Sequence, residues 1–192
     1  MRTAQIAYDL KYQGLPIIFT WPAGAEDGLV ASSFINKTYE KNYHSAIASQ
    51  NDAIAFLRWL ATLKIPIYMG IHSMGHQVMI PALEKLSAEF AEPFIEELVL
   101  NAPDLSVDDF QRIAPSLRKV AKRTTLYCSF NDNAISASET FNSNRRLGGC
   151  ATAEGIDVIN ASEVDAPILG LGLGHGYYSS RPIITDLYQI LL

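Results

Sequence analysis

The sequence has no long apolar run and no excess of positive charge, and each absence excludes a class of protein. No stretch reaches the roughly 18 consecutive apolar residues that a membrane-spanning helix needs, and the N-terminus has no apolar signal core. The 15 basic and 20 acidic side chains give a net charge of -5, with no Lys/Arg-rich run that would follow a phosphate backbone. We therefore expect no membrane segment and no nucleic-acid partner, and a cytoplasmic protein if Met1 is the true start.

Cysteine is also scarce. Cys128 and Cys150 are the only two, and they match no CxxC pattern and no Cys/His zinc spacing. Neither a disulfide framework nor a metal site is indicated, so we expect two free thiols. We also expect neither a metal nor an organic cofactor.

The apolar residues that are present form short runs that alternate with stretches of helical spacing. The 192 residues are enough for a single domain, 1–192, to bury its own core. Nearly continuous apolar strands alternating with helices are typical of a parallel sheet covered on both faces, so the sequence predicts the α/β class with about five strands. The predicted strands are LPIIFTW (15–21), IPIYMGI (65–71), FIEELVL (94–100), RTTLYCSF (123–130) and GIDVINA (155–161). The predicted helices cover 46–63, 74–86 (which Pro81 should kink), 107–120 and 184–192.

One serine lies between a predicted strand and a predicted helix, in MGIHSMGHQV (69–78). This is the setting of a nucleophile elbow, a sharp turn that exposes a serine hydroxyl and aims the next backbone N–H, that of Met74, at a developing oxyanion. Gly75 provides the small residue that such a turn wants after Ser73, but Ile71 stands where glycine is usual before it. The alternative is that Ser73 is an ordinary helix N-cap.

A nucleophilic serine needs a base and an acid, which in this fold class follow it in the order Asp/Glu, then His. His175, in GLGHGYY, is the only histidine in the second half of the chain, and Asp132 directly follows a predicted strand in SFNDNA. Both positions lie at or beyond the carboxyl ends of strands, where parallel sheets bind ligands. The order therefore favours a triad of Ser73, Asp132 and His175.

Other assignments remain open for the same positions. Asp132 can be a turn or cap residue, and His175 an exposed loop residue. Asp104, in LVLNAPD, also ends a predicted strand and is the alternative acid. His72 and His76 flank the serine and are weaker candidates for the base.

Three aromatic residues are candidates for a substrate pocket. Trp21 ends an early predicted strand, and Tyr177 and Tyr178 are close to His175; all three can equally be packing residues. A nucleotide-binding domain is a third hypothesis, but the sequence does not favour it. No GxGxxG or Walker-type loop follows any predicted strand, and the glycine-rich GLGLGHG (170–176) does not open a βαβ unit.

Several blocks of the sequence resemble, in order, a bacterial α/β-hydrolase family of mostly unassigned function, described as esterase- or lipase-like. The blocks are IAYDLKYQGLPIIFTWP, IHSMGHQV, LVLNAPDLSVDDF, TLYCSFNDNAISAS, GIDVINASEVD and GHGYYSS. The resemblance covers nearly the whole chain and implies a three-layer α/β-hydrolase sandwich. It also implies that Ser73 is the nucleophile, Asp132 the acid and His175 the base, and it favours Asp132 over Asp104.

The sequence departs from the family pattern in two ways. The family tends to have a small residue at Ile71 and asparagine at His76. In the family, a strand ending in His-Gly precedes the helix containing IAYDL, and its loop supplies a second oxyanion N–H. The resemblance thus implies a chain that is N-terminally truncated relative to the family and lacks half of the oxyanion hole.

These expectations lead to two hypotheses about function. The first is a serine hydrolase that cleaves a small-molecule carboxylic ester through an acyl-enzyme. The second is a catalytically weak or inactive remnant that acts as a binding or interaction domain. An in-frame upstream strand would favour the first hypothesis, and a true start at Met1 the second.

Overall fold

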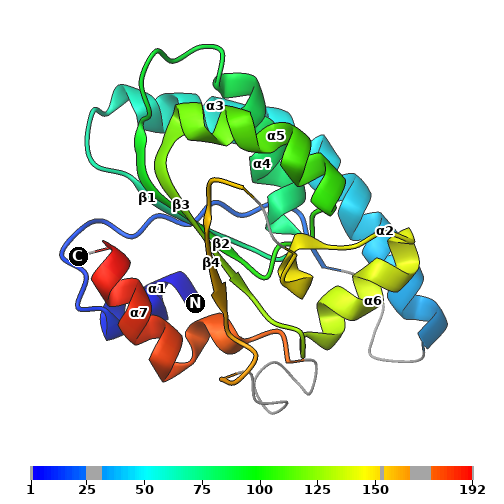
Figure 1. Ribbon diagram of the computed structural model, residues 1–192. Helices are drawn as coiled ribbons and strands as arrows, with labels where there is room; N and C mark the ends of the chain where they lie inside the picture. Colours follow the sequence, from blue (N-terminus) through cyan, green and yellow to red (C-terminus); the bar gives the residue numbers. More distant parts are fainter. Residues whose placement is uncertain (1, 25–31, 152–153, 165–173, 192) are drawn as a thin grey trace.

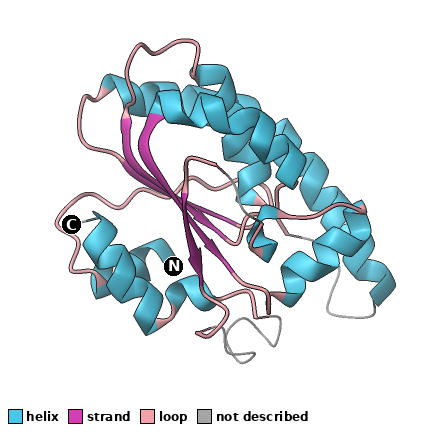
Figure 2. Ribbon diagram, in the orientation of Figure 1, coloured by secondary structure: helices cyan, strands magenta, loops and turns pink. Residues whose placement is uncertain are grey.

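The computed structural model describes residues 2–24, 32–151, 154–164 and 174–191. Within these ranges four strands form one sheet in the order β1 (Tyr68–His72), β2 (Ile95–Asn101), β3 (Ala121–Cys128) and β4 (Asp157–Asn160). All three pairings are parallel. The carboxyl ends of the strands therefore meet at one edge of the sheet, as Figure 2 shows.

Helices cover both faces of this sheet. Figure 1 shows α3, α4 and α5 on one face and α1 and α7 on the other, which makes a three-layer α/β sandwich as expected. The helices are α1 (Arg2–Asp9), α2 (Ser32–Ala48), α3 (Gln50–Thr62), α4 (Gly75–Leu86), α5 (Val107–Val120), α6 (Asn133–Asn142) and α7 (Arg181–Leu191), with 3-10 turns η1 (Leu147–Gly149) and η2 (Tyr177–Ser179).

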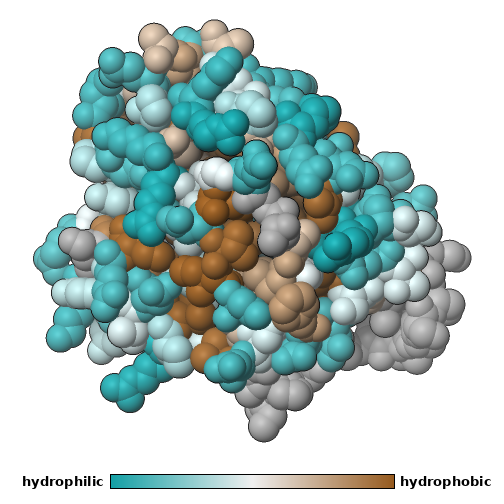
Figure 3. Space-filling model, in the orientation of Figure 1, coloured by the Kyte–Doolittle hydropathy of each residue, from teal (hydrophilic) through white to brown (hydrophobic). Residues whose placement is uncertain are grey.

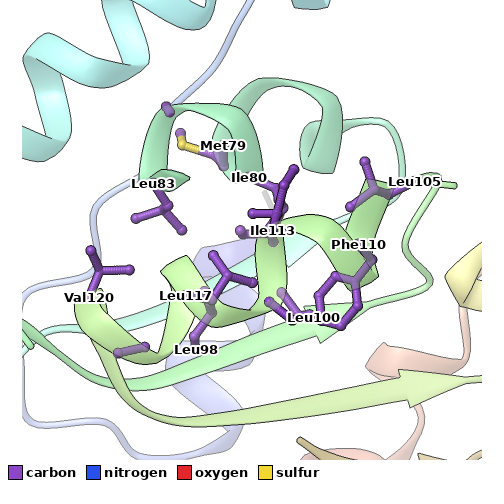
Figure 4. Packing of buried hydrophobic residues seen from close by; sticks show 14 of the residues in the cluster. Met79, Ile80, Leu83, Leu98, Leu100, Leu105, Phe110, Ile113, Leu117 and Val120 are labelled. Atoms are coloured by element: carbon purple, nitrogen blue, oxygen red, sulfur yellow. The ribbon is translucent and has the colours of Figure 1, made fainter. Parts of the chain in front are cut away.

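The alternation of side chains along β2 divides the core into two parts. Leu98 and Leu100 pack with α4 and α5 in the larger hydrophobic cluster (Figure 4), whereas Val99 belongs to the cluster that includes α7. Strand residues i and i+2 point to the same face, so every second residue must be apolar on each side. A strand segment buried on both faces has consecutive apolar residues, as in 98–100 of β2 and 126–128 of β3, and these runs are why the sequence revealed both strands.

The first predicted strand, 15–21, is wrong. Residues 15–21 are all described, but none of them forms a strand, and β1 pairs only with β2. Ile17 and Ile18 remain 42 % and 50 % exposed. An extended segment becomes a strand only when a neighbouring strand takes its backbone hydrogen bonds, and none of the described strands pairs with residues 15–21. The described sheet has four strands instead of about five.

The predicted helix 46–63 is two helices. Helix α2 ends at Ala48 and α3 begins at Gln50, so Ile47 lies on a different helix from Leu57 and is 40 % exposed. The helices expected over 74–86, 107–120 and 184–192 are present as α4, α5 and α7, and the sequence had not indicated α2 over most of its length or α6.

Helix α4 continues through Pro81. Proline has no N–H to donate to the carbonyl four residues earlier, that of Gln77. The side chain of Gln50, on α3, donates to this carbonyl oxygen instead, at 2.9 Å. A side chain from the neighbouring helix thus replaces the hydrogen bond that proline removes.

The expectation of two free thiols is also wrong. Cys128 and Cys150 form a disulfide, with their Cα atoms 5.0 Å apart. The backbone brings the two segments together, because the N–H of Ser129 donates to the carbonyl of Gly148. This contact joins the end of β3 to η1, and the spacing of 22 residues carried no signal of it.

Candidate active site

Three side chains that come from separate parts of the sequence meet at the carboxyl edge of the sheet. Ser73 directly follows β1, Asp132 lies in the turn after β3, and His175 precedes η2 and α7. The Nε2 atom of His175 is 2.7 Å from Ser73 Oγ, and its Nδ1 atom is 2.7 Å from Asp132 Oδ2. With Nδ1 protonated, the imidazole donates to the carboxylate and accepts from the serine hydroxyl, which is the arrangement of a Ser-His-Asp triad.

Ser73 lies in a sharp turn and does not cap α4. Its φ of 52° is in the left-handed region, which is unfavourable for a residue other than glycine. The N–H of Ser73 donates to the carbonyl of Asn101 on β2, and its own carbonyl accepts from the backbone N–H groups of His76 and Asp104. These contacts hold the turn, and Met74 takes the N-cap position.

Ile71 occupies the position before the turn where glycine is usual. Its side chain is buried in the main core, so it points away from solvent and packs with the larger hydrophobic cluster. A Cβ atom at Gly75 would lie 3.6 Å from Ile71 Cγ2, which is an ordinary van der Waals contact.

Asp132 is both a helix cap and the partner of His175. Its Oδ1 atom accepts from the backbone N–H groups of Ala134 and Ile135 at 3.0 and 3.1 Å, which caps α6. Its Oδ2 atom faces His175, and its side chain is fully buried. Asp132 therefore caps a helix and also contacts His175, and the cap fixes the direction of the second oxygen.

Asp104, the alternative acid, has different partners. Its carboxylate accepts from Ser138 Oγ at 2.5 Å and from Tyr39 OH at 3.0 Å, and it lies 3.2 Å from Arg146 Nε. Asp104 and Arg146 are both buried, and burial together with the Asp104 charge raises the pKa of Tyr39. Asp104 thus joins α2, α6 and η1 to the end of β2, a contact that nothing in the local sequence around Tyr39 or Arg146 indicated.

The two histidines that flank Ser73, His72 and His76, both have packing contacts. The ring of His72 packs between His175 and Tyr178, with ring centroids 4.7 and 4.2 Å away. His76 is fully buried, and its Nδ1 atom lies 2.7 Å from the carbonyl oxygen of Ser73, to which it donates. Burial lowers the pKa of His76 to about 3, so it is neutral at physiological pH.

The three aromatic pocket candidates differ in position. Trp21 is partly buried and lines a cavity of about 340 Å³ beside β1. Tyr178 lines a second cavity of about 280 Å³ that also borders β1. Tyr177 is wrong as a pocket residue: it is completely buried, and its hydroxyl donates to the carbonyl of Tyr127.

Within the described ranges, no group of three or more His, Cys, Asp or Glu side chains could hold a metal ion. No helix of the described chain is long and apolar enough to cross a membrane. Residues 170–173 of the glycine-rich stretch 170–176 lie outside the described residues.

Comparison with known proteins agrees with this architecture. No curated protein and no solved structure matches the chain. One family model, described as "Alpha/beta hydrolase of unknown function (DUF900)", matches residues 1–192. A parallel sheet between helices, with a serine turn after one strand, is what this description implies. The chain belongs to this family of α/β hydrolases.

Proposed function

We propose that this protein is a serine hydrolase that cleaves carboxylic esters of small molecules. The observation that carries the proposal is the continuous pair of hydrogen bonds from Ser73 Oγ through His175 to Asp132, both 2.7 Å long. Nucleophile and base within hydrogen-bond reach, with the base oriented by a third group, are the signature of an activated serine.

In the proposed reaction, Ser73 Oγ attacks the ester carbonyl carbon while His175 Nε2 takes the hydroxyl proton. The proton then passes from His175 to the leaving alcohol as the ester C–O bond breaks, which leaves an acyl group on Ser73. Water attacks this acyl-enzyme, with His175 again as the base, and releases the acid. Asp132 accepts a hydrogen bond from Nδ1–H throughout and stabilises the transient imidazolium.

Met74 is proposed as a donor to the oxyanion. It directly follows Ser73 and is the N-cap residue of α4, so its N–H belongs to the first unpaired donors of that helix. The positive end of the helix dipole favours the negative charge that develops on the carbonyl oxygen. The turn at Ser73 therefore presents the nucleophile and this donor on neighbouring residues.

A fluorophosphonate probe tests the proposal directly. We expect the wild type to be labelled on Ser73, and Ser73→Ala to lose labelling and at least about 10³-fold in ester hydrolysis. Ser116→Ala, a serine on α5 outside the site, is the matched control and should keep both. Labelling that persists in Ser73→Ala would disprove the assignment. A folded wild type that takes no label would favour a non-catalytic binding domain instead.

A further inference from the structure

His175 lies on a segment whose backbone has much conformational freedom. Glycines flank it on both sides, and Gly174 has a φ of 65°, in the left-handed region. Residues 174–176 belong to no helix or strand, and η2 begins at Tyr177. A catalytic side chain must be held within roughly 0.5 Å of its productive position. The position of this imidazole therefore depends on the contacts of its side chain.

The two hydrogen bonds of His175 restrain its ring only in part. One joins Nε2 to Ser73 Oγ, and the other joins Nδ1 to Asp132 Oδ2. Both ring nitrogens form their hydrogen bonds in the plane of the imidazole, so these bonds resist movement within that plane. They resist rotation about the line through the two nitrogens much less. A contact with the face of the ring is needed to fix this tilt.

The ring of His72 provides such a contact. Its centroid lies 4.7 Å from that of His175, with 45° between the two planes, and this distance is typical of packed aromatic rings. His72 is the last residue of β1, where it is paired with Asn101 of β2. The sheet therefore holds the backbone of the residue that contacts the proposed base.

A second aromatic contact holds the ring of His72 itself. The ring of Tyr178 lies 4.2 Å from it, centroid to centroid, and Tyr178 is buried. Tyr178 belongs to η2, and its neighbour Tyr177 is joined to β3 by the hydrogen bond from its hydroxyl to the carbonyl of Tyr127. Two strands thus fix the His72 ring, β1 through its own backbone and β3 through η2.

We propose that His72 is a positioning residue for the hydrolase reaction and sets the tilt of the His175 imidazole, so that Nε2 stays directed at Ser73 Oγ. The inference rests on the proposed function. In this role His72 touches no substrate and carries no proton, because its flat ring makes the contact and its nitrogens are not needed. Phenylalanine can therefore replace it, whereas an aliphatic side chain has no flat face to offer.

Steady-state hydrolysis of p-nitrophenyl acetate is the first test. His72→Ala should lower kcat about 10- to 10²-fold with little change in KM, because a misplaced base slows proton transfer without altering binding. His72→Phe should restore most of kcat, and His72→Leu should not. Titration of active sites with a fluorophosphonate corrects kcat for unfolded protein, which a purely structural role would change instead. His44→Ala, at an exposed histidine of α2, is the control and should match the wild type.

Proton NMR measures the restraint on the ring without turnover. The Nδ1 proton of His175, in its hydrogen bond to Asp132, gives a downfield signal that is identified by its loss in His175→Gln. We expect this proton to exchange with water faster in His72→Ala than in the wild type, and at the wild-type rate in His72→Phe.

The outcomes separate this inference from the proposed function. An unchanged kcat in folded His72→Ala would overturn the inference and leave the hydrolase in place; if this variant does not fold, His72→Leu takes its place. A loss of kcat in His72→Phe as large as in His72→Ala would also overturn it, since the ring nitrogens would then be needed. A wild type without Ser73-dependent hydrolysis would refute the proposed function and this inference with it.

Discussion

At the scale of single residues, the two candidate acids show how a buried carboxylate is given its role by its partners. Asp132 uses one oxygen to cap α6 and keeps the other for His175. Asp104 is equally buried, but its oxygens are taken by Ser138, Tyr39 and Arg146. The first is arranged to orient an imidazole, and the second to hold segments together.

Substituting each aspartate by asparagine should separate these two roles. Asp132→Asn keeps an oxygen for the helix cap but loses the carboxylate that orients His175, so we expect kcat to fall about 10³- to 10⁴-fold with little change in stability. The measurement pairs ester hydrolysis with urea unfolding.

Asp104→Asn is the matched comparison and should show the reverse pattern. It leaves the buried Arg146 without its ionic partner, which costs about 3–5 kcal/mol of unfolding free energy. The folded fraction should keep most of its kcat. A large loss of kcat in folded Asp104→Asn, with normal activity in Asp132→Asn, would exchange the two assignments.

At the scale of elements, the disulfide fixes the segment around η1 against the end of β3. Cys128 is the last residue of β3, four positions before Asp132, and Cys150 follows η1. Arg146, the partner of Asp104, lies in the same enclosed loop. Disulfides persist in oxidising compartments and are rare in the cytosol. The disulfide therefore does not favour the cytoplasmic location expected from the sequence, and that location stays a prediction.

Reduction of this disulfide should destabilise the fold. The bond closes a loop across 22 positions, for which removal costs about 2–4 kcal/mol. We expect dithiothreitol to lower the unfolding midpoint of the wild type. The Cys128→Ala, Cys150→Ala variant is the control, and its midpoint should not respond to dithiothreitol. An unchanged wild-type midpoint after complete thiol titration would show that the bond does not contribute.

At the scale of the whole molecule, two clusters of buried hydrophobic residues pack against opposite faces of the sheet. Figure 3 shows that some hydrophobic residues also gather at the surface in the middle of one face, around the place where Figure 1 shows β4. Val158 of β4 is 42 % exposed, as expected for an edge strand.

The larger hydrophobic cluster encloses the first turn of α4, and it buries His76 there completely.

The burial of His76 couples the stability of the whole chain to pH. Its pKa is about 3 in the folded protein, against an ordinary value of 6.5. Between these values the unfolded chain binds a proton that the folded chain does not, so stability falls as the pH falls. The slope approaches about 1.4 kcal/mol per pH unit.

His76→Asn should remove this contribution while its amide can still donate to the Ser73 carbonyl. We expect the stability advantage of the wild type over His76→Asn to shrink steadily from pH 6.5 to pH 4, as measured by urea unfolding. Parallel curves for the two proteins across this range would show that His76 titrates normally in the folded state.

The sequence by itself determined the α/β class and the order of the candidate site residues. The second halves of β2 and β3 are buried on both faces, and each contains a short apolar run, 98–100 and 126–128, that is visible without a structure. Ser73 and Asp132 were found because each follows a predicted strand, and His175 because it is the only histidine in the second half of the chain. These signals are local, and they depend only on spacing along the chain.

Only the tertiary structure decided which distant groups meet. Residues 15–21 have strand-like composition, yet they form no strand, because in the described part of the chain no strand pairs with them. The pairing of Cys128 with Cys150 depends on the path of the chain between the two cysteines. The ion pair of Asp104 with Arg146 likewise depends on how the segments that carry these two residues pack together. The type of a residue limits the contacts that it can make. The packing of segments that are distant in the sequence decides which of these contacts forms.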